Sequence, residues 1–290
     1  MKNTTNIVKF KRVVFVLLAG MPVLAGILYA FLYSIGIFGV LNNGMSSTAW
    51  ALVLTDISFW KSIAFSMYIG ITSVSVSSIL SFLLAYWWRE NFKSGILSVA
   101  IYLPLCFPAT VMAFFMYQML SQSGFVSRIA FLFDFTEGIS TFPEFINDPF
   151  GIGIILTMVA LISPFFVLLF LNTFQSEKIE ELSAIAATLG ASKKQLISRI
   201  IVPTLFKKNA ASLLLFIVFV MGNYEVPLLL GRQNPQMIAV AIVQKIQRYN
   251  LYDIPKGYVM SIIYVGLLLV ALGIIAFKNP QFFKTKDNND

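Results

Sequence analysis

The amino-acid sequence predicts an all-α, polytopic membrane protein with six transmembrane helices. Hydrophobic residues fill 58% of the 290 positions and charged residues only 12%, and the mean hydropathy is +0.82. Soluble domains, in contrast, carry charge at about a quarter of their residues. The apolar residues also form runs of about 20, the length that a helix needs to cross a bilayer. We therefore expect one membrane domain over residues 1–290 and no soluble domain.

Six apolar runs are long enough to span a bilayer. The expected spans cover about residues 13–33, 62–88, 95–120, 151–174, 209–230 and 257–277. The first run is too long for the core of a signal peptide and has no clear small-residue cleavage site, so we expect it to be retained. The other five runs form a core over about residues 60–277.

Several residues mark the ends and breaks of these spans. The second span ends in Trp87, Trp88 and Arg89, as an interfacial aromatic belt followed by a cation would. The third contains Pro104 and Pro108. Backbone breaks at membrane depth are tolerated where neighbouring helices or a cavity satisfy the freed carbonyl groups. We therefore keep this run as a span with a broken helix.

The distribution of basic residues predicts the orientation. The N-terminus, the turn at 89–94, the loop at 175–208 and the C-terminal tail hold 15 of the 21 Lys and Arg residues. The three opposite loops hold the remaining six. Loops rich in Lys and Arg remain in the cytoplasm. Both termini and the 175–208 loop are therefore expected there.

Residues 177–203, called the 177–203 segment below, are too polar to lie in a bilayer. Apolar residues recur at spacings of three and four and predict one face of a first helix: Ile179, Leu182, Ile185, Ala186 and Leu189. Gly190 is expected to end this helix. Ser192 and Gln195 have the spacing of a capping box that starts a second helix, and Pro203 is expected to close it. The pattern favours a docking element between two spans.

The 177–203 segment resembles the signature of permease subunits of ABC importers that use a binding protein, with the type I, MetI-like fold. That signature reads Glu-Ala-Ala, three residues, Gly, nine residues and Ile-x-Leu-Pro. Five residues fall at matching positions: Ala186, Gly190, Ala191, Ile200 and Pro203. Ile185 and Val202 replace the usual Ala and Leu. Ala184 replaces the leading acid, and we expect Glu180 and Glu181, about one turn earlier, to take over part of its role.

The resemblance covers about residues 60–277. Further landmarks are the two prolines of the third span, SGFVSR at 123–128 and GNYEVPLLLG at 222–231. The last of these looks closest to the branch of the family that carries polyamines, ferric iron or thiamine. The resemblance therefore implies import of a small cationic solute.

The resemblance also implies partners and a membrane. The chain would lie in the inner (cytoplasmic) membrane, pair with a second permease of the same or another kind, and receive its solute from an extracytoplasmic binding protein. Two separate ATPase subunits would drive it. The residues implied in coupling to them are Glu180, Glu181, Ala184, Ala186, Gly190, Ala191, Ile200 and Pro203. No GxxxxGK[ST] stretch occurs, so the chain itself is expected to be non-catalytic.

Glu225 is the only acid that we place inside a span, and intramembrane carboxylates are costly enough to indicate function. With Tyr224 and Asn223 it is a candidate for the substrate pathway. Alternatively, its carboxylate is hydrogen-bonded to the third outer loop or paired with Arg232.

Other classes of function remain alternatives. A stand-alone secondary transporter or channel would need paired charges at the midplane and an inverted repeat, and we find one acid and no clear repeat. A membrane enzyme has little support, since His is absent and the lone Cys106 falls in an apolar run. We expect no metal, cofactor or nucleic-acid partner. The apolar face of 179–189 could also lie on the membrane surface instead of in a partner's groove.

Overall fold

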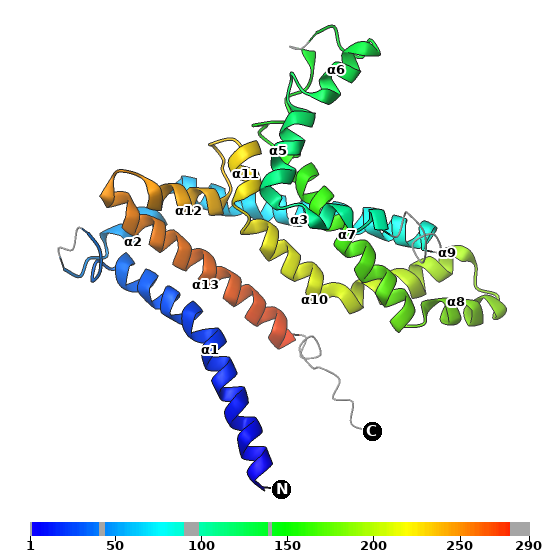
Figure 1. Ribbon diagram of the computed structural model, residues 1–290, viewed down its shortest axis with the longest axis horizontal. Helices are drawn as coiled ribbons and strands as arrows, with labels where there is room; N and C mark the ends of the chain where they lie inside the picture. The colour runs from blue at the N-terminus through cyan, green and yellow to red at the C-terminus, as the bar shows by residue number, and fades with distance from the viewer. Residues whose placement is uncertain (1, 41–43, 90–98, 139–140, 279–290) are drawn as a thin grey trace. The chain divides into compact units, whose positions relative to one another are not determined.

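The computed structural model describes residues 2–40, 44–89, 99–138 and 141–278, and every regular element in these ranges is helical, as predicted (Figure 1). In chain order the elements are α1 (Lys2–Ser34), α2 (Thr48–Leu54), α3 (Ile57–Trp88), the 3₁₀ helix η1 (Leu103–Cys106), α5 (Ala109–Leu120), α6 (Phe125–Leu132), α7 (Ile152–Ser176), α8 (Ile179–Thr188), α9 (Lys193–Leu196), the π-helix η3 (Ile197–Ile201), α10 (Val202–Met221), α11 (Glu225–Leu230), α12 (Ile238–Gln247), the 3₁₀ helix η4 (Leu251–Asp253) and α13 (Ile254–Lys278).

Five helices in the described part of the chain are long and apolar enough to cross a bilayer. They are Leu17–Ser34, Ile57–Trp88, Ile152–Ser176, Lys193–Met221 and Leu251–Ile275. The third expected span, 95–120, begins outside the described residues. Its described part is interrupted: Phe107 is extended between η1 and α5, and Pro108 directly precedes α5. Proline has no N–H to donate and suits a helix start. The six-span count stays a prediction.

The fifth expected span, 209–230, differs from the structure at both ends. One continuous helix runs from Lys193 to Met221, and residues 222–224 separate it from α11. The expectation that Pro203 closes a helix is therefore wrong. Proline cannot donate a hydrogen bond to the carbonyl four residues earlier. The helix accommodates this defect by widening into the π-turn η3, which ends two residues before Pro203.

The described residues within 1–60 and 241–278 form one compact unit. In it, α1 packs against α13, with the Tyr33 and Tyr258 rings 4.5 Å apart. The indole N–H of Trp50 in α2 donates to the Ser34 hydroxyl at 3.1 Å. The buried Asp253 accepts a hydrogen bond from Lys256 at 2.8 Å. Polar contacts therefore fix the ends of α1 and α13.

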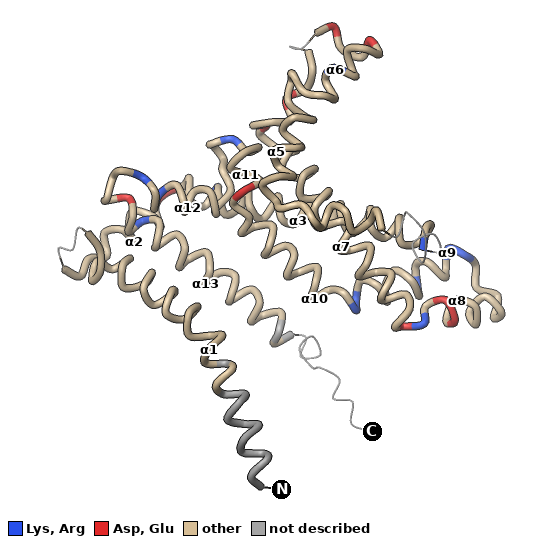
Figure 2. The backbone as a smooth tube through the Cα atoms, viewed as in Figure 1, with Lys and Arg blue, Asp and Glu red and all other residues tan. Residues whose placement is uncertain are grey.

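The described residues within 61–240 form the second unit, whose core surrounds α7. α7 contains no charged residue, and Phe166 and Phe170 on it are fully buried. Among the described residues of this unit, charged residues gather instead around α8 and α9 and beside α6 (Figure 2). Asn209 of α10, also buried, donates to the Thr173 hydroxyl of α7 at 2.9 Å. The 177–203 segment thus follows directly after α7, and its helix α8 contacts α7.

Candidate functional site

A turn of only two residues, Glu177 and Lys178, joins α7 to α8. Lys178 adopts a left-handed conformation with φ = 48°, and its N–H donates to the Gln175 carbonyl at 3.2 Å. Nζ of Lys208 in α10 lies 3.0 Å from Oε1 of Glu177. The start of α8 is therefore fixed by both α7 and α10.

The apolar residues of α8 divide between two environments. Ile179 is fully buried in the core cluster that includes Phe174. Leu182, Ile185 and Leu189 are 47%, 59% and 83% exposed. The predicted single apolar face is therefore only partly right, because its first residue anchors α8 to the chain's own core. Leu182, Ile185 and Leu189 form an exposed apolar patch, and Ala186, the remaining residue of the predicted face, is half-buried.

The end of α8 has the predicted glycine stop. Gly190 has φ = 87°, in the left-handed region that favours glycine. The Ala191 N–H donates to the Ala186 carbonyl and the Gly190 N–H to the Ala187 carbonyl, each at 3.0 Å. These two bonds form a Schellman motif, which satisfies carbonyl groups left over at a helix end.

The predicted capping box follows. The Gln195 N–H donates to the Ser192 hydroxyl at 3.4 Å, and the Ser192 N–H donates to the Gln195 side-chain oxygen at 2.8 Å. Each side chain therefore satisfies a free N–H group of the other residue. The direction of the chain between α8 and α9 is set locally.

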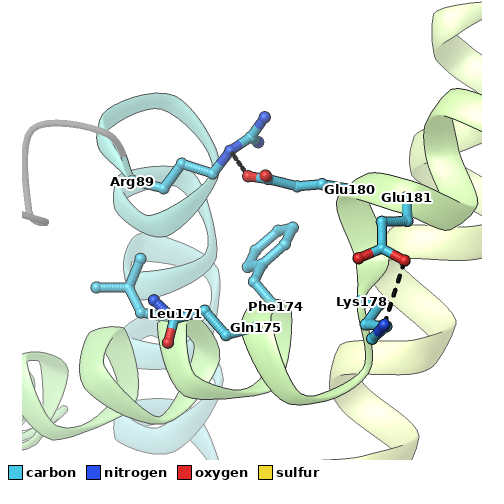
Figure 3. A pocket seen from close by; sticks show the side chains of 7 residues that line it. All are labelled: Arg89, Leu171, Phe174, Gln175, Lys178, Glu180 and Glu181. Carbon is cyan, nitrogen blue, oxygen red and sulfur yellow. Dashed lines mark ion pairs between the residues drawn. The ribbon is translucent and has the colours of Figure 1, made fainter.

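Two ion pairs surround the first turn of α8 (Figure 3). Nε of Arg89, the residue after α3, lies 2.7 Å from Oε1 of Glu180. Nζ of Lys178 lies 3.5 Å from Oε2 of Glu181. The guanidinium carbon of Arg89 is also 5.7 Å from the centroid of the Phe174 ring. The pairs border a cavity of about 230 Å³, lined by Arg89, Leu171, Phe174, Gln175, Lys178, Glu180 and Glu181.

The second candidate site lies at the start of α11. Glu225 occupies the first turn of this helix, where a carboxylate is favoured by the helix dipole. Its Oε2 accepts a hydrogen bond from the Thr110 hydroxyl of α5 at 2.6 Å. The Asn223 side chain accepts the Val226 N–H at 3.0 Å. Among the described residues, no Lys or Arg side chain, Arg232 included, forms an ion pair with Glu225.

Comparison with known families decides the broad class of the protein. Residues 77–283 match the family described as binding-protein-dependent transport system inner membrane component. The chain belongs to this family. It is therefore a permease of the ABC transporter class with several membrane-crossing helices.

Individual members of the permease family show how far the similarity extends. The sulfate transport system permease protein CysT of Synechocystis sp. is 24% identical over 232 residues, which cover 80% of this chain and 75% of that protein. A crystal structure of a bacterial alginate ABC transporter, in complex with a periplasmic protein bound to an alginate pentasaccharide, superposes with a TM-score of 0.69 at 16% identity. The match covers 97% of this chain and 96% of that one.

A second crystal structure, of a bacterial ABC transporter involved in import of the acidic polysaccharide alginate, gives a TM-score of 0.67 at 18% identity. It covers 98% of this chain and 96% of that one. At such low identity these structures support the fold of the permease alone. They agree with the all-helical membrane architecture described above.

The structure places the remaining predicted coupling residues of this permease along one short stretch. Ala184 is exposed on α8, whereas Ala186 and Ala191 are half-buried near its end. Ile200 is half-buried in η3, and Pro203 is exposed in the first turn of α10. α8 and η3 are in contact, so the two halves of the signature lie side by side. Their role in coupling stays a prediction.

Three residues near these sites were missed by reasoning from the sequence: Arg89, Lys208 and Thr110. Arg89 was interpreted as an interfacial cation, yet it pairs with Glu180, far along the chain. Its partner could not be chosen among the acids of the loops from spacing alone. Thr110 gave no signal, because a single hydroxyl in an apolar helix is usually bonded to its own backbone.

Proposed function

We propose that this permease forms half of the translocation pathway of an ATP-driven importer and couples to a separate ATPase subunit through α8. The exposed apolar patch of Leu182, Ile185 and Leu189 carries the proposal. Large apolar side chains on a helix end need a partner surface to cover them. A groove in an ATPase subunit supplies such a surface, and an external binding protein supplies the solute.

The surrounding structure supports docking at α8. α8 is short and amphipathic, and a Schellman turn and a capping box fix its exit. Ile179, Glu177 and Glu180 attach its first turn to the rest of the chain. A helix fixed at one end, with an apolar patch toward the other, suits binding in a partner's groove.

The test is retention of the ATPase by the purified permease. Ile185→Glu places a charge in the exposed patch and should abolish retention, because burying an unpaired carboxylate is costly. Ala187→Glu adds the same charge at an exposed position on another face of α8 and should retain the ATPase. Full retention by Ile185→Glu would show that the patch lies on another surface, such as the lipid headgroups.

Two observations favour opposite charges for the transported solute. The exposed carboxylate of Glu225, without a cation among the described residues, favours a cationic solute such as a polyamine, ferric iron or thiamine. The names of the relatives, which mention sulfate and the acidic polysaccharide alginate, favour an anion. Mass spectrometry of the ligand that copurifies with the binding protein separates the two, and an anionic ligand would overturn the cationic proposal.

A further inference from the structure

Arg89 contacts three helices at once. It follows the last residue of α3, and its Nη1 donates to the Tyr86 carbonyl of that helix at 3.5 Å. Its guanidinium group lies over the ring of Phe174 in α7 and beside the carboxylate of Glu180 in α8 (Figure 3). An arginine can do this because its planar cation can lie over an aromatic face and at the same time pair with a nearby carboxylate. The residue therefore joins the end of α3 to the first turn of α8.

Glu180 and the exposed patch lie on different faces of α8. On a helix with 3.6 residues per turn, side chains two positions apart point about 160° from each other, and side chains five positions apart about 140°. Glu180 thus points away from both Leu182 and Ile185 and toward Arg89. It can hold α8 against α3 without occupying the face that we assign to the ATPase. Glu181 is bonded differently, to Lys178 at the start of the same helix.

α3 is in turn fixed to the membrane helices of the same unit. The Ser81 hydroxyl donates to the Ser163 carbonyl of α7 at 2.9 Å, and both residues are buried. Gly70 allows close approach of α10, since a Cβ atom there would lie 3.1 Å from the Ile217 carbonyl oxygen. A displacement of α8 that reaches Arg89 is therefore passed to α3, and through α3 to α7 and α10.

We propose that Arg89 is a positioning residue whose ion pair with Glu180 makes α8 and α3 move together during the transport cycle. This inference rests on the proposed function. It also assigns Glu180 an internal partner, so that in this chain the acid does not serve as a contact to the ATPase. The Lys208–Glu177 ion pair connects α10 in a comparable way to the two-residue turn between α7 and α8.

The experiment uses the complete purified transporter, with its ATPase subunits, in lipid bilayers. Hydrolysis of MgATP is measured with and without the binding protein, carrying whatever ligand it retains from cells. Arg89→Glu and Glu180→Arg should each reduce the stimulation by the binding protein about tenfold, while the ATPase subunits stay bound. The double variant R89E/E180R restores opposite charges and should return the stimulation to within about threefold of wild type.

Matched variants separate positioning from folding. Arg89→Lys keeps the charge and should retain most of the stimulation, even if Arg89→Glu fails to insert. Lys207→Glu reverses an exposed charge of the same region that forms no ion pair among the described residues, and should behave as wild type.

Wild-type stimulation in Arg89→Glu would overturn the inference, as would a double variant no better than the single ones. A wild-type permease that retains no ATPase would instead overturn the proposed function itself, and the inference with it. The two failures are therefore distinguishable.

Discussion

Gly190 ends α8 because of its backbone conformation and not because of crowding. Its φ is 87°, and a Cβ atom added there would meet nothing within 4 Å. The left-handed conformation costs a residue with a side chain about 1–2 kcal/mol, and it costs a β-branched residue more. Substitution should therefore disturb the turn rather than the packing around it.

We predict that Gly190→Val leaves the permease inserted in the membrane but weakens its retention of the ATPase. Gly190→Asn should be close to wild type, because Asn adopts the left-handed conformation more readily than other residues do. The measurement is the amount of ATPase that copurifies with equal amounts of permease. Equal retention by the two variants would show that the conformation of Gly190 has no role in docking.

Glu225 can be tested by separating its charge from its hydrogen bond. Glu225→Gln keeps an oxygen that can accept from Thr110 but removes the charge. We predict normal assembly and a reduction in solute uptake of about tenfold or more, as for loss of a charge-assisted contact. Thr110→Val removes the hydroxyl but keeps the carboxylate, and should reduce uptake less. Loss of assembly in Glu225→Gln would instead assign the residue a structural role.

At the scale of single elements, α3 depends on a small residue where it meets α10. A Cβ atom at Gly70 would lie 2.9 Å from Cγ of Met221 and 3.1 Å from the Ile217 carbonyl oxygen. Small residues let membrane helices approach closely. The backbone oxygen cannot move as a side chain can, so an added methyl group must push the helices apart.

We predict that Gly70→Ala lowers the free energy of unfolding of the permease by about 1–3 kcal/mol, the usual cost of overpacking. Gly266→Ala in α13 is the matched control, because nothing lies within 4 Å of the added atom. Alanine also favours the helix over glycine there. Thermal unfolding in detergent measures both variants. A neutral Gly70→Ala would show that α3 and α10 are less tightly packed than the structure indicates.

The sequence was most informative where structure is determined by neighbouring residues. The Gly190 stop and the Ser192–Gln195 capping box are both confirmed, because their hydrogen bonds connect residues at most five positions apart. Pro203 shows the limit of this reasoning. Its effect depends on whether the preceding turn can widen, and the π-turn that does so has no signature in residue type.

The relation between distant elements was not predictable from the sequence. The contact of Arg89 with Glu180 and that of Thr110 with Glu225 depend on how α3 packs beside α8 and α5 beside α11. Each residue has several possible partners of suitable charge or polarity. For the same reason α8 was expected to have one apolar face, although Ile179 is covered by the chain's own core.

At the scale of the whole molecule, the membrane orientation stays a prediction. The excess of Lys and Arg in alternate loops places the N-terminus, the C-terminus and the 177–203 segment in the cytoplasm. Single cysteines introduced at the two termini and at Gln195, in a Cys106→Ser background, should be protected from a membrane-impermeant maleimide in intact cells. A cysteine at Gln247 should react, and labelling at Gln195 from outside would contradict both the orientation and the proposed docking.

The two-residue connection between α7 and α8 has a mechanical consequence. A linker this short, with Lys178 in a left-handed turn and Glu177 bonded to Lys208, leaves no slack between the two helices. A force applied to the exposed end of α8 is therefore transmitted directly to α7, the most buried of the long apolar helices. Inserting a few glycines into this linker should therefore leave the proposed ATPase bound but prevent its movements from reaching α7.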